Sequence, residues 1–246
     1  MKVLATQPKL VEQVHEAIVS EISAGKMKPG ERIIQEQIAQ LLGVSRQPVQ
    51  QALLLLRNQG VLRDAPGRGL IVAPLDLDHV SNMYEIRAVM EGLAFRMAAE
   101  RNAERAQRQG PALIQNGLKA AGRSSVATMI AADLKFHEFI YELSDNPLIA
   151  PTMESQWTYT RRVMGEVLMR DERPRDIWEQ HTAMLEAVMS GDGAAAEALA
   201  RQHITQAAAV MISRLRSEAA ATAAASLPAV DVSVDLSAGG GARAQR

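Results

Sequence analysis

One aspartate and three histidines in the second half of the chain are the residues whose types could bind a divalent metal. Asp133 and His137 lie four residues apart, which places both on one face of a helix. His181 and His203 lie in two later segments with apolar neighbours at helical spacing. Neutral imidazoles and a carboxylate suit Zn²⁺, Ni²⁺, Mn²⁺ or Fe²⁺. Spacing alone more often marks hydrogen-bonded core histidines, so both interpretations stay open at this point.

The elements that must position these residues are helices. From Asp76 onward glycine and proline become sparse, and apolar residues recur with the helical period for well over a hundred residues. We expect an all-α bundle of six or seven helices. The last stretch, Ala221–Arg246, has no amphipathic pattern and predicts a disordered tail. The predicted helices span roughly 78–101, 103–121, 125–144, 147–169, 174–190 and 192–220.

The first 75 residues have a different pattern. A helix is predicted over Leu10–Ala24, a second ends at Gly43, and a third begins with Ser45 as its N-cap and ends near Gly60. Two short strand candidates, 61–63 and 70–72, flank a glycine-rich turn and predict a β-hairpin wing. The predicted fold is therefore mainly α: an N-terminal winged helix-turn-helix and a C-terminal helical bundle, over 8–74 and 78–220.

Composition and charge limit the function classes. The 246 residues are 47% hydrophobic with a net charge of −1, which argues against wholesale disorder. Residues 1–75 hold nine Lys or Arg against six Asp or Glu, whereas the remainder is net negative and holds four of the five histidines. Cysteine is absent, which excludes disulfides, thiolate metal sites and a cysteine nucleophile. No apolar run is long enough to span a bilayer and no signal peptide is evident, so we expect a cytoplasmic protein.

A string of short motifs in the N-terminal part carries a family resemblance. Pro29-Gly30, Leu42-Gly43-Val44-Ser45-Arg46, Pro48-Val49, Ala52-Leu53 and the wing's Gly67-Arg68-Gly69 together resemble the winged-helix domain of the GntR family of bacterial transcription regulators. A recognition helix presents its N-terminal polar side chains to base edges, and the resemblance places Arg46 foremost among them. The DNA-binding candidates are Arg32, Gln37, Ser45, Arg46, Gln47, Gln50 and Arg68.

One departure from the family pattern affects the DNA prediction. Gln50-Gln51 stands where the family usually has Arg-Glu after Pro-Val. Exchanging a cation for an amide implies a shallower salt dependence, and glutamine can pair with adenine where arginine would favour guanine. We therefore expect an operator that differs from the usual family half-site.

The region from about 78 to 217 resembles the FCD effector domain of the FadR subfamily. The resemblance rests on Arg87 and Glu91, Asp133 with Phe136-His137, Asn146-Pro147-Leu148, His181, Gly191-Asp192 and His203. It implies that Asp133, His137, His181 and His203 are metal ligands, with zinc expected first and nickel, manganese or iron as alternatives. It also implies a small carboxylate effector.

An arginine is expected to hold the far end of that carboxylate. Arg87 is the first candidate, and Arg161 or Arg162 the next. An ion pair of Arg87 with Glu91, four residues on, is an equally good interpretation.

These inferences combine into one functional hypothesis. We expect a homodimeric regulator that binds double-stranded operator DNA, represses transcription, and is released by a small organic or aromatic acid at the metal site. An alternative is that the metal itself is the signal. A metalloenzyme is the rival from another class, but no additional general base or nucleophile accompanies the ligand set, and we expect no enzyme.

Overall fold

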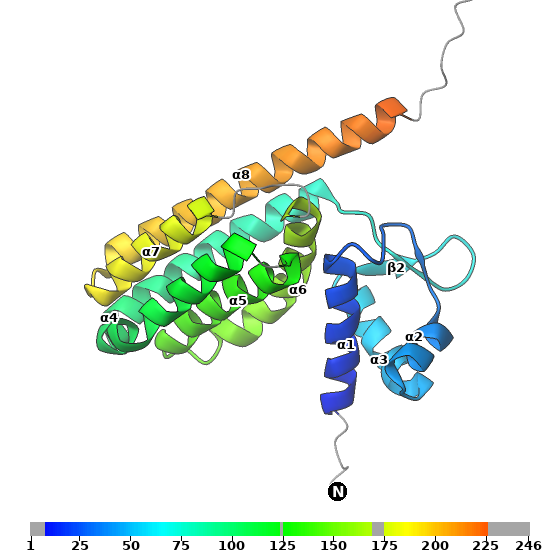
Figure 1. Ribbon diagram of the computed structural model, residues 1–246, viewed down its shortest axis with the longest axis horizontal. Coiled ribbons are helices and arrows are strands. Elements are labelled where there is room, and N and C mark those ends of the chain that lie inside the picture. The colour runs from blue at the N-terminus through cyan, green and yellow to red at the C-terminus, as the bar shows by residue number, and fades with distance from the viewer. Residues whose placement is uncertain (1–7, 124, 169–174, 226–246) are drawn as a thin grey trace, which may run out of the picture.

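The computed structural model describes residues 8–123, 125–168 and 175–225 and shows an N-terminal domain beside a helical bundle (Figure 1). The N-terminal elements are α1 (Pro8–Ser23), β1 (Arg32–Ile33), α2 (Gln35–Leu42), α3 (Arg46–Asn58), β2 (Leu62–Asp64) and β3 (Leu70–Val72). The bundle elements are α4 (Leu77–Arg123), α5 (Val126–Leu143), α6 (Ile149–Leu168), α7 (Arg175–Met189) and α8 (Gly193–Ala225).

The N-terminal domain has the predicted helix-turn-helix and wing. Gly43 adopts a left-handed conformation (φ 64°) after α2, and Ser45 occupies the N-cap position of α3 in an extended conformation. The small antiparallel sheet has the order β1-β3-β2, with Arg63 opposite Ile71. The wing was predicted, whereas β1 was not, because two residues show no alternation from which a strand could be recognised.

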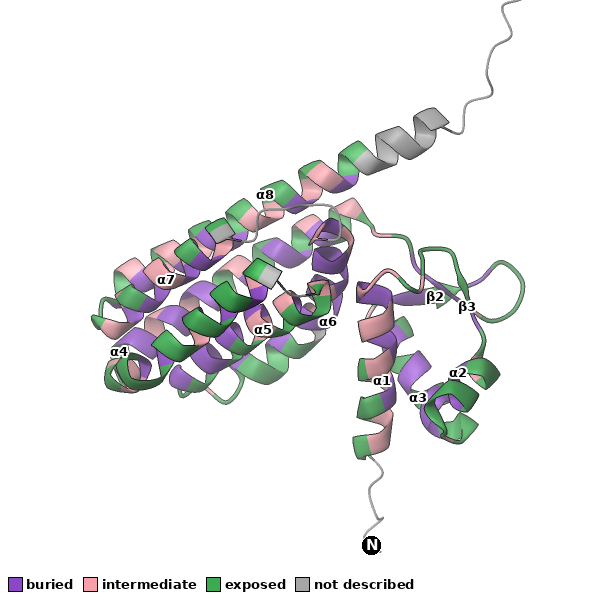
Figure 2. Cartoon of the chain, viewed as in Figure 1, coloured by how far each residue is buried: buried purple, intermediate pink, exposed green. Residues whose placement is uncertain are grey.

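The bundle is arranged around α4, which packs against α5, α7 and α8. α4 contains a kink at Asn102, whose backbone is non-helical (φ −138°, ψ 32°). The described residues of the bundle therefore form six helical segments, where six or seven were predicted. The Asn102 side-chain amide donates to the Leu143 carbonyl and to Asp145, each at 2.8 Å, and thereby ties the kink to the end of α5. The buried residues of these helices lie mainly on the sides that face one another (Figure 2).

The C-terminal end differs from the prediction. α8 continues to Ala225, beyond the predicted start of the tail at Ala221, because the alanine-rich sequence there strongly favours a helix. The remainder of the predicted tail, 226–246, lies outside the described residues. Within the part of the chain that the structure covers, no helix is long and apolar enough to cross a membrane.

The two domains contact each other through α1 and α6. The closest point is Gly165 of α6, where an added Cβ would overlap the backbone carbonyl of Ser23 at the end of α1. Because only glycine fits without a shift, the sequence itself favours this close approach.

Candidate metal centre and DNA-binding surface

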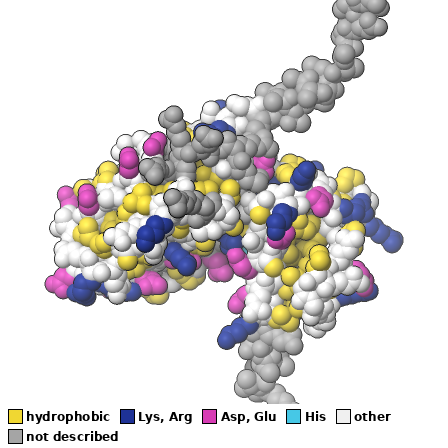
Figure 3. Space-filling model, viewed as in Figure 1, with side chains coloured by type: hydrophobic (Ala, Val, Ile, Leu, Met, Phe, Trp, Pro, Cys, Tyr) yellow, Lys and Arg dark blue, Asp and Glu magenta, His cyan; other side chains and the backbone are white. Residues whose placement is uncertain are grey.

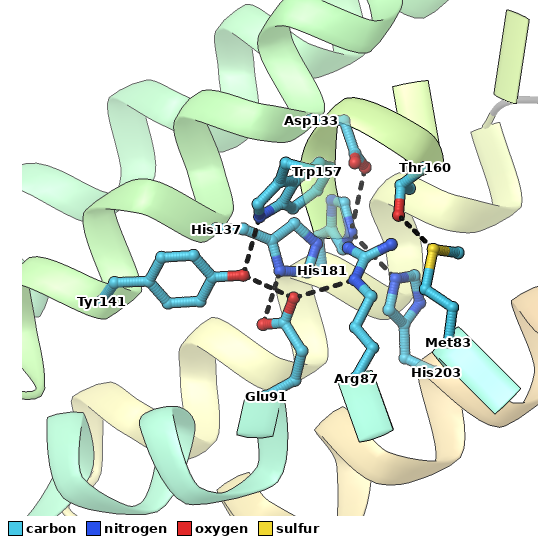
Figure 4. Close-up of polar contacts among 10 residues, drawn as sticks. All are labelled: Met83, Arg87, Glu91, Asp133, His137, Tyr141, Trp157, Thr160, His181 and His203. Carbon is cyan, nitrogen blue, oxygen red and sulfur yellow. Dashed lines mark hydrogen bonds and ion pairs between the residues drawn. The ribbon is translucent and has the colours of Figure 1, made fainter. Parts of the chain in front are cut away.

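Three histidines from three different helices meet inside the bundle. His137 of α5, His181 of α7 and His203 of α8 place one ligand nitrogen each within 4.8 Å of the others, and all three are buried (Figure 4). The Nε2 atoms of His181 and His203 are 3.3 Å apart. Two imidazole nitrogens on one tetrahedral zinc ion would be separated by about the same distance, given Zn–N bonds of about 2.0–2.1 Å.

An unpartnered nitrogen of His137 supports the same interpretation. Nδ1 of His137 is hydrogen-bonded to Glu91 at 2.9 Å, whereas its Nε2 is buried and has no hydrogen-bond partner. Nδ1 of His181 is also buried without a partner, but it lies across the ring from the Nε2 atom that faces His203 and Asp133, so it is not the nitrogen directed into this cluster. Because an unsatisfied buried polar atom is costly, such atoms in a native protein call for a ligand or ion. The residues therefore fit a divalent metal.

Asp133 joins the histidine cluster through His181. Its Oδ1 lies 3.5 Å from Nε2 of His181, and the aspartate is buried, which raises the pKa of its carboxyl group. A buried carboxylate is favourable only beside a cation. The four residues predicted as ligands are thus brought together, with the mutually close nitrogens supplied by the histidines and the oxygen by Asp133 at their edge.

His181 and His203 are held in the neutral form that binds metal. Burial lowers the pKa of His181 well below its usual range, and the neighbouring His203 and His137 lower it further. Burial, together with His137 and Arg87, lowers the pKa of His203 to about 3. Both imidazoles are therefore neutral at physiological pH and can donate a lone pair.

Glu91 is the central residue that the sequence interpretation missed. Its carboxylate is fully buried, accepts hydrogen bonds from the Tyr141 hydroxyl (2.7 Å) and Arg87 Nε (3.2 Å), and contacts Nδ1 of His137. Burial alone would raise the pKa of Glu91, but His137, Arg87 and Tyr141 together lower it to about 2. A carboxylate on the far nitrogen of a ligating histidine fixes its ring and tautomer. The sequence interpretation named Glu91 only as part of the family resemblance and as a possible ion-pair partner of Arg87, four residues before it.

Arg87 forms the ion pair with Glu91 that was one of its two predicted roles, and its effector-binding role stays a prediction. It is buried, pairs with Glu91, and its guanidinium carbon lies 4.1 Å from the centroid of the Trp157 ring. Figure 4 shows the guanidinium extending from α4 toward the histidines. We call the buried site formed by Arg87, Trp157 and the three histidines the histidine chamber.

The other two predicted effector arginines lie elsewhere. Arg161 of α6 forms a two-pronged ion pair with Glu16 of α1, at 2.7 and 2.5 Å. Arg162 is buried and donates to the backbone carbonyl of Ala73, in the segment between β3 and α4. Both arginines therefore contact the N-terminal domain, and the structure does not bring them into the histidine chamber.

The predicted DNA-binding residues all lie on the exposed surface of the N-terminal domain. Arg46, Gln47 and Gln50 follow the outer face of α3, and Arg68 lies at the wing tip between two glycines with positive φ. Ser45 makes no capping hydrogen bond, so its hydroxyl is open to a phosphate. Lys and Arg side chains project from this domain on its side away from the bundle (Figure 3). The remaining exposed candidates are Arg32 and Gln37.

Arg46 has a protein partner that the sequence interpretation did not anticipate. It forms an ion pair with Glu36 in the first turn of α2, and both side chains are more than half exposed. An exposed ion pair contributes little to stability, so a phosphate or base edge can replace Glu36 at low cost.

Comparison with known proteins assigns each region to a known domain type. Residues 10–72 match the family described as bacterial regulatory proteins, gntR family, and residues 82–206 match the FCD domain. The uncharacterized HTH-type transcriptional regulator YdhC of Bacillus subtilis is 27% identical over 195 residues, which cover 78% of this chain and 84% of the relative. The HTH-type transcriptional repressor RspR of Escherichia coli is 25% identical, covering 82% of this chain and 88% of the relative.

Solved structures show the same fold. E. coli McbR/YncC superimposes with a TM-score of 0.74 at 22% identity, covering 86% of this chain and 99% of that one. A transcriptional regulator described as GntR from Rhodococcus sp. RHA1 gives a TM-score of 0.68 at 21% identity, over 82% and 97% of the two chains. The winged helix and the helical bundle thus occur together in related chains.

Proposed function

The chain belongs to the GntR family of bacterial transcription regulators that carry an FCD domain, and from this premise we propose that it is a metal-dependent sensor of small carboxylates. As a DNA-binding regulator it reads its operator with α3 and the wing. We further propose that it acts as a homodimer and a repressor of the FadR subfamily. A relative at 25% identity is named a repressor, which supports that direction.

One observation carries this proposal: the three-histidine cluster lies beside a buried arginine. His137, His181, His203 and Asp133 would hold the ion, for which zinc is the first expectation and nickel, manganese or iron the alternatives. A bound divalent ion would supply a Lewis-acid site for an anionic oxygen. The guanidinium of Arg87 can pair with the same anion or with a second carboxylate of the effector.

The chain's own residues limit how an anion could be bound beside the metal. Arg87 is already neutralised by Glu91, and Trp157 covers its guanidinium face. A carboxylate that pairs with Arg87 must therefore compete with Glu91 for the guanidinium and displace the indole, whereas a carboxylate bound to the ion alone need not. Effectors with an aromatic or apolar body are favoured, because Trp157 and Phe136 provide apolar surface there.

Dimerisation supports operator recognition on physical grounds. One recognition helix makes few base contacts, and two half-sites spaced by one helical turn supply the specificity that a single domain lacks. The effector would then release DNA by favouring a dimer geometry that no longer matches this spacing.

The test combines metal content, effector screening and DNA binding. Purified protein is expected to bind Zn²⁺ by calorimetry with one ion per chain, and His181→Ala to lose this binding while the exposed His79→Ala retains it. Carboxylates that raise the melting temperature of the zinc-loaded protein are expected to release an operator selected from genomic DNA. Release by zinc alone would favour a metal sensor instead, and turnover of the carboxylate without any specific DNA binding would favour an enzyme.

A further inference from the structure

α6 contacts the histidine chamber and the DNA-binding domain from adjacent turns. On the chamber side, the indole N–H of Trp157 donates to the Tyr141 hydroxyl at 2.9 Å, and its ring lies 5.2 Å from that of His137. Four residues on, Arg161 holds both carboxylate oxygens of Glu16 in α1. Residues four apart are neighbours on a helix, so one turn of α6 separates the two contacts.

Further contacts fix α6 to the N-terminal domain. Arg162 binds the carbonyl of Ala73, and the backbone N–H of Asp76 donates to the Tyr159 hydroxyl at 3.4 Å. Gly165 lies against the backbone at the end of α1. Because α1 packs on α3, a displacement of α6 would reach the recognition helix through α1 as well as through the segment between β3 and α4.

A groove between the domains shares its wall with the histidine chamber. The groove has a volume of about 830 Å³, and Tyr141 and Trp157 line it from the bundle while Glu12, Glu16 and Leu55 line it from the N-terminal domain. Tyr141 also hydrogen-bonds to Glu91 inside the bundle. The same two aromatic side chains therefore separate the chamber from the interdomain surface.

We propose that α6 couples the histidine chamber to the DNA-binding domain, with Trp157 as the positioning residue on the chamber side and the Arg161–Glu16 ion pair as the contact on the domain side. This inference rests on the proposed function, because it describes how the same site is regulated. A ligand changes the contact of α1 with α6 only if it binds the docked and undocked arrangements with different affinity. By linkage, docking of α1 then changes the affinity of the chamber for that ligand by the same factor. Trp157 provides that difference, since it contacts Arg87 and is one turn from the ion pair.

The test uses the full chain, Zn²⁺ as the probe and amide hydrogen exchange of α1 as the readout. In the wild type, Zn²⁺ is expected to change the exchange rate of α1 by about fivefold, the lower end of measured coupling factors. Glu16→Gln and Arg161→Gln are each expected to lose most of this response. Glu21→Gln is the matched control, because Glu21 is also on α1 and 47% exposed against 57% for Glu16, but pairs with Lys26 of its own domain.

A charge swap guards against misfolding of the single variants. Combining Glu16→Arg with Arg161→Glu rebuilds the ion pair in the opposite sense and is expected to restore the response to Zn²⁺. The proposal is overturned if Zn²⁺ binds to the wild type but α1 exchange does not respond, or responds equally in Glu16→Gln.

A double-mutant cycle measured without Zn²⁺ tests the coupling independently of the proposed metal site. If Zn²⁺ binds wild type and His181→Ala equally, the proposed metal centre is wrong. The coupling is then tested with Trp157→Phe, which removes the indole N–H but keeps an aromatic ring. Trp157→Phe is expected to change α1 exchange in the wild type and to have little further effect in Glu16→Gln. Additive effects of the two changes would overturn the coupling.

Discussion

Replacement of Glu91 by glutamine tests the polar network that supports the metal centre. The Glu91 carboxylate accepts hydrogen bonds from Tyr141 and Arg87 and is hydrogen-bonded to His137. The whole group is buried. Glutamine keeps the shape of the side chain but removes its charge. Its amide N–H₂ also places a hydrogen-bond donor against one of the donors that the carboxylate accepted from. Arg87 is then a buried cation without a counter-ion, and breaking one partner of a buried pair costs about 3–5 kcal/mol.

This cost is large relative to the free energy of unfolding of a typical protein, which is about 5–15 kcal/mol. Urea unfolding of the metal-free protein at neutral pH is therefore expected to show a loss of about 3–5 kcal/mol for Glu91→Gln. Zinc affinity measured by calorimetry is expected to fall about 10–100-fold, since His137 loses the group that fixes its ring.

Two further variants make the result interpretable. Glu85→Gln, an exposed glutamate on the same helix, is expected to leave both quantities unchanged within about 0.5 kcal/mol. Adding Arg87→Met to Glu91→Gln removes the uncompensated charge and is expected to recover at least half of the lost stability. A loss below about 1 kcal/mol for Glu91→Gln would refute the reasoning, because a buried ion pair cannot be broken so cheaply.

The other predictions concern the domain contact and the DNA-binding surface. Gly165→Ala is expected to lower the melting temperature through overpacking of about 1–3 kcal/mol, whereas Gly122→Ala, with open space around it, is expected to be neutral or stabilising. Glu36→Gln is expected to tighten DNA binding, and Arg46→Ala to weaken it by about 1–3 kcal/mol. Both are measured by fluorescence anisotropy with operator DNA, and equal binding by both variants would exclude competition between the Glu36 carboxylate and DNA. The pKa of Glu16 is lowered by its hydrogen bond to the α6 arginine, so its contribution is complete above its usual value of 4.5 and is lost as the pH falls through the lower folded value. Urea titrations from about pH 6 to 3 are expected to show the difference between wild type and Glu16→Gln disappearing at the acid end, and a constant difference would contradict this assignment.

The sequence was sufficient for most of the fold because its signals are local. Helical periodicity located the bundle helices, and the predicted break between 101 and 103 coincides with the kink at Asn102. The turn glycine at Gly43 and the glycines around Arg68 located the helix-turn-helix and the wing. Strand β1 was missed because its partner, β3, is far away in the sequence, and pairing rather than local pattern creates it.

The site was predictable only as far as residue type determines role. Histidines on apolar helix faces left the metal interpretation open, and the resemblance to the FCD domain selected the four candidate ligands. The structure brings His137, His181 and His203 together. Arginine is ambiguous, because periodicity gives the face of a helix that a residue occupies but not the neighbour it meets. Arg161 therefore looked like an effector ligand until the position of α1 supplied Glu16 as its partner.

The charges of the histidine chamber argue for a specific class of effector. Arg87 and Glu91 neutralise each other, and the histidines beside them are uncharged or hydrogen-bonded to that pair. Asp133, ionised beside a divalent ion, would cancel one of its two positive charges and leave a net charge of one. A buried site with one uncompensated positive charge is unfavourable until a single anion enters. With the proposed ion bound, the chamber would therefore be complementary to one carboxylate, and an effector with a second carboxylate would have to take Arg87 from Glu91 and move Trp157 in doing so.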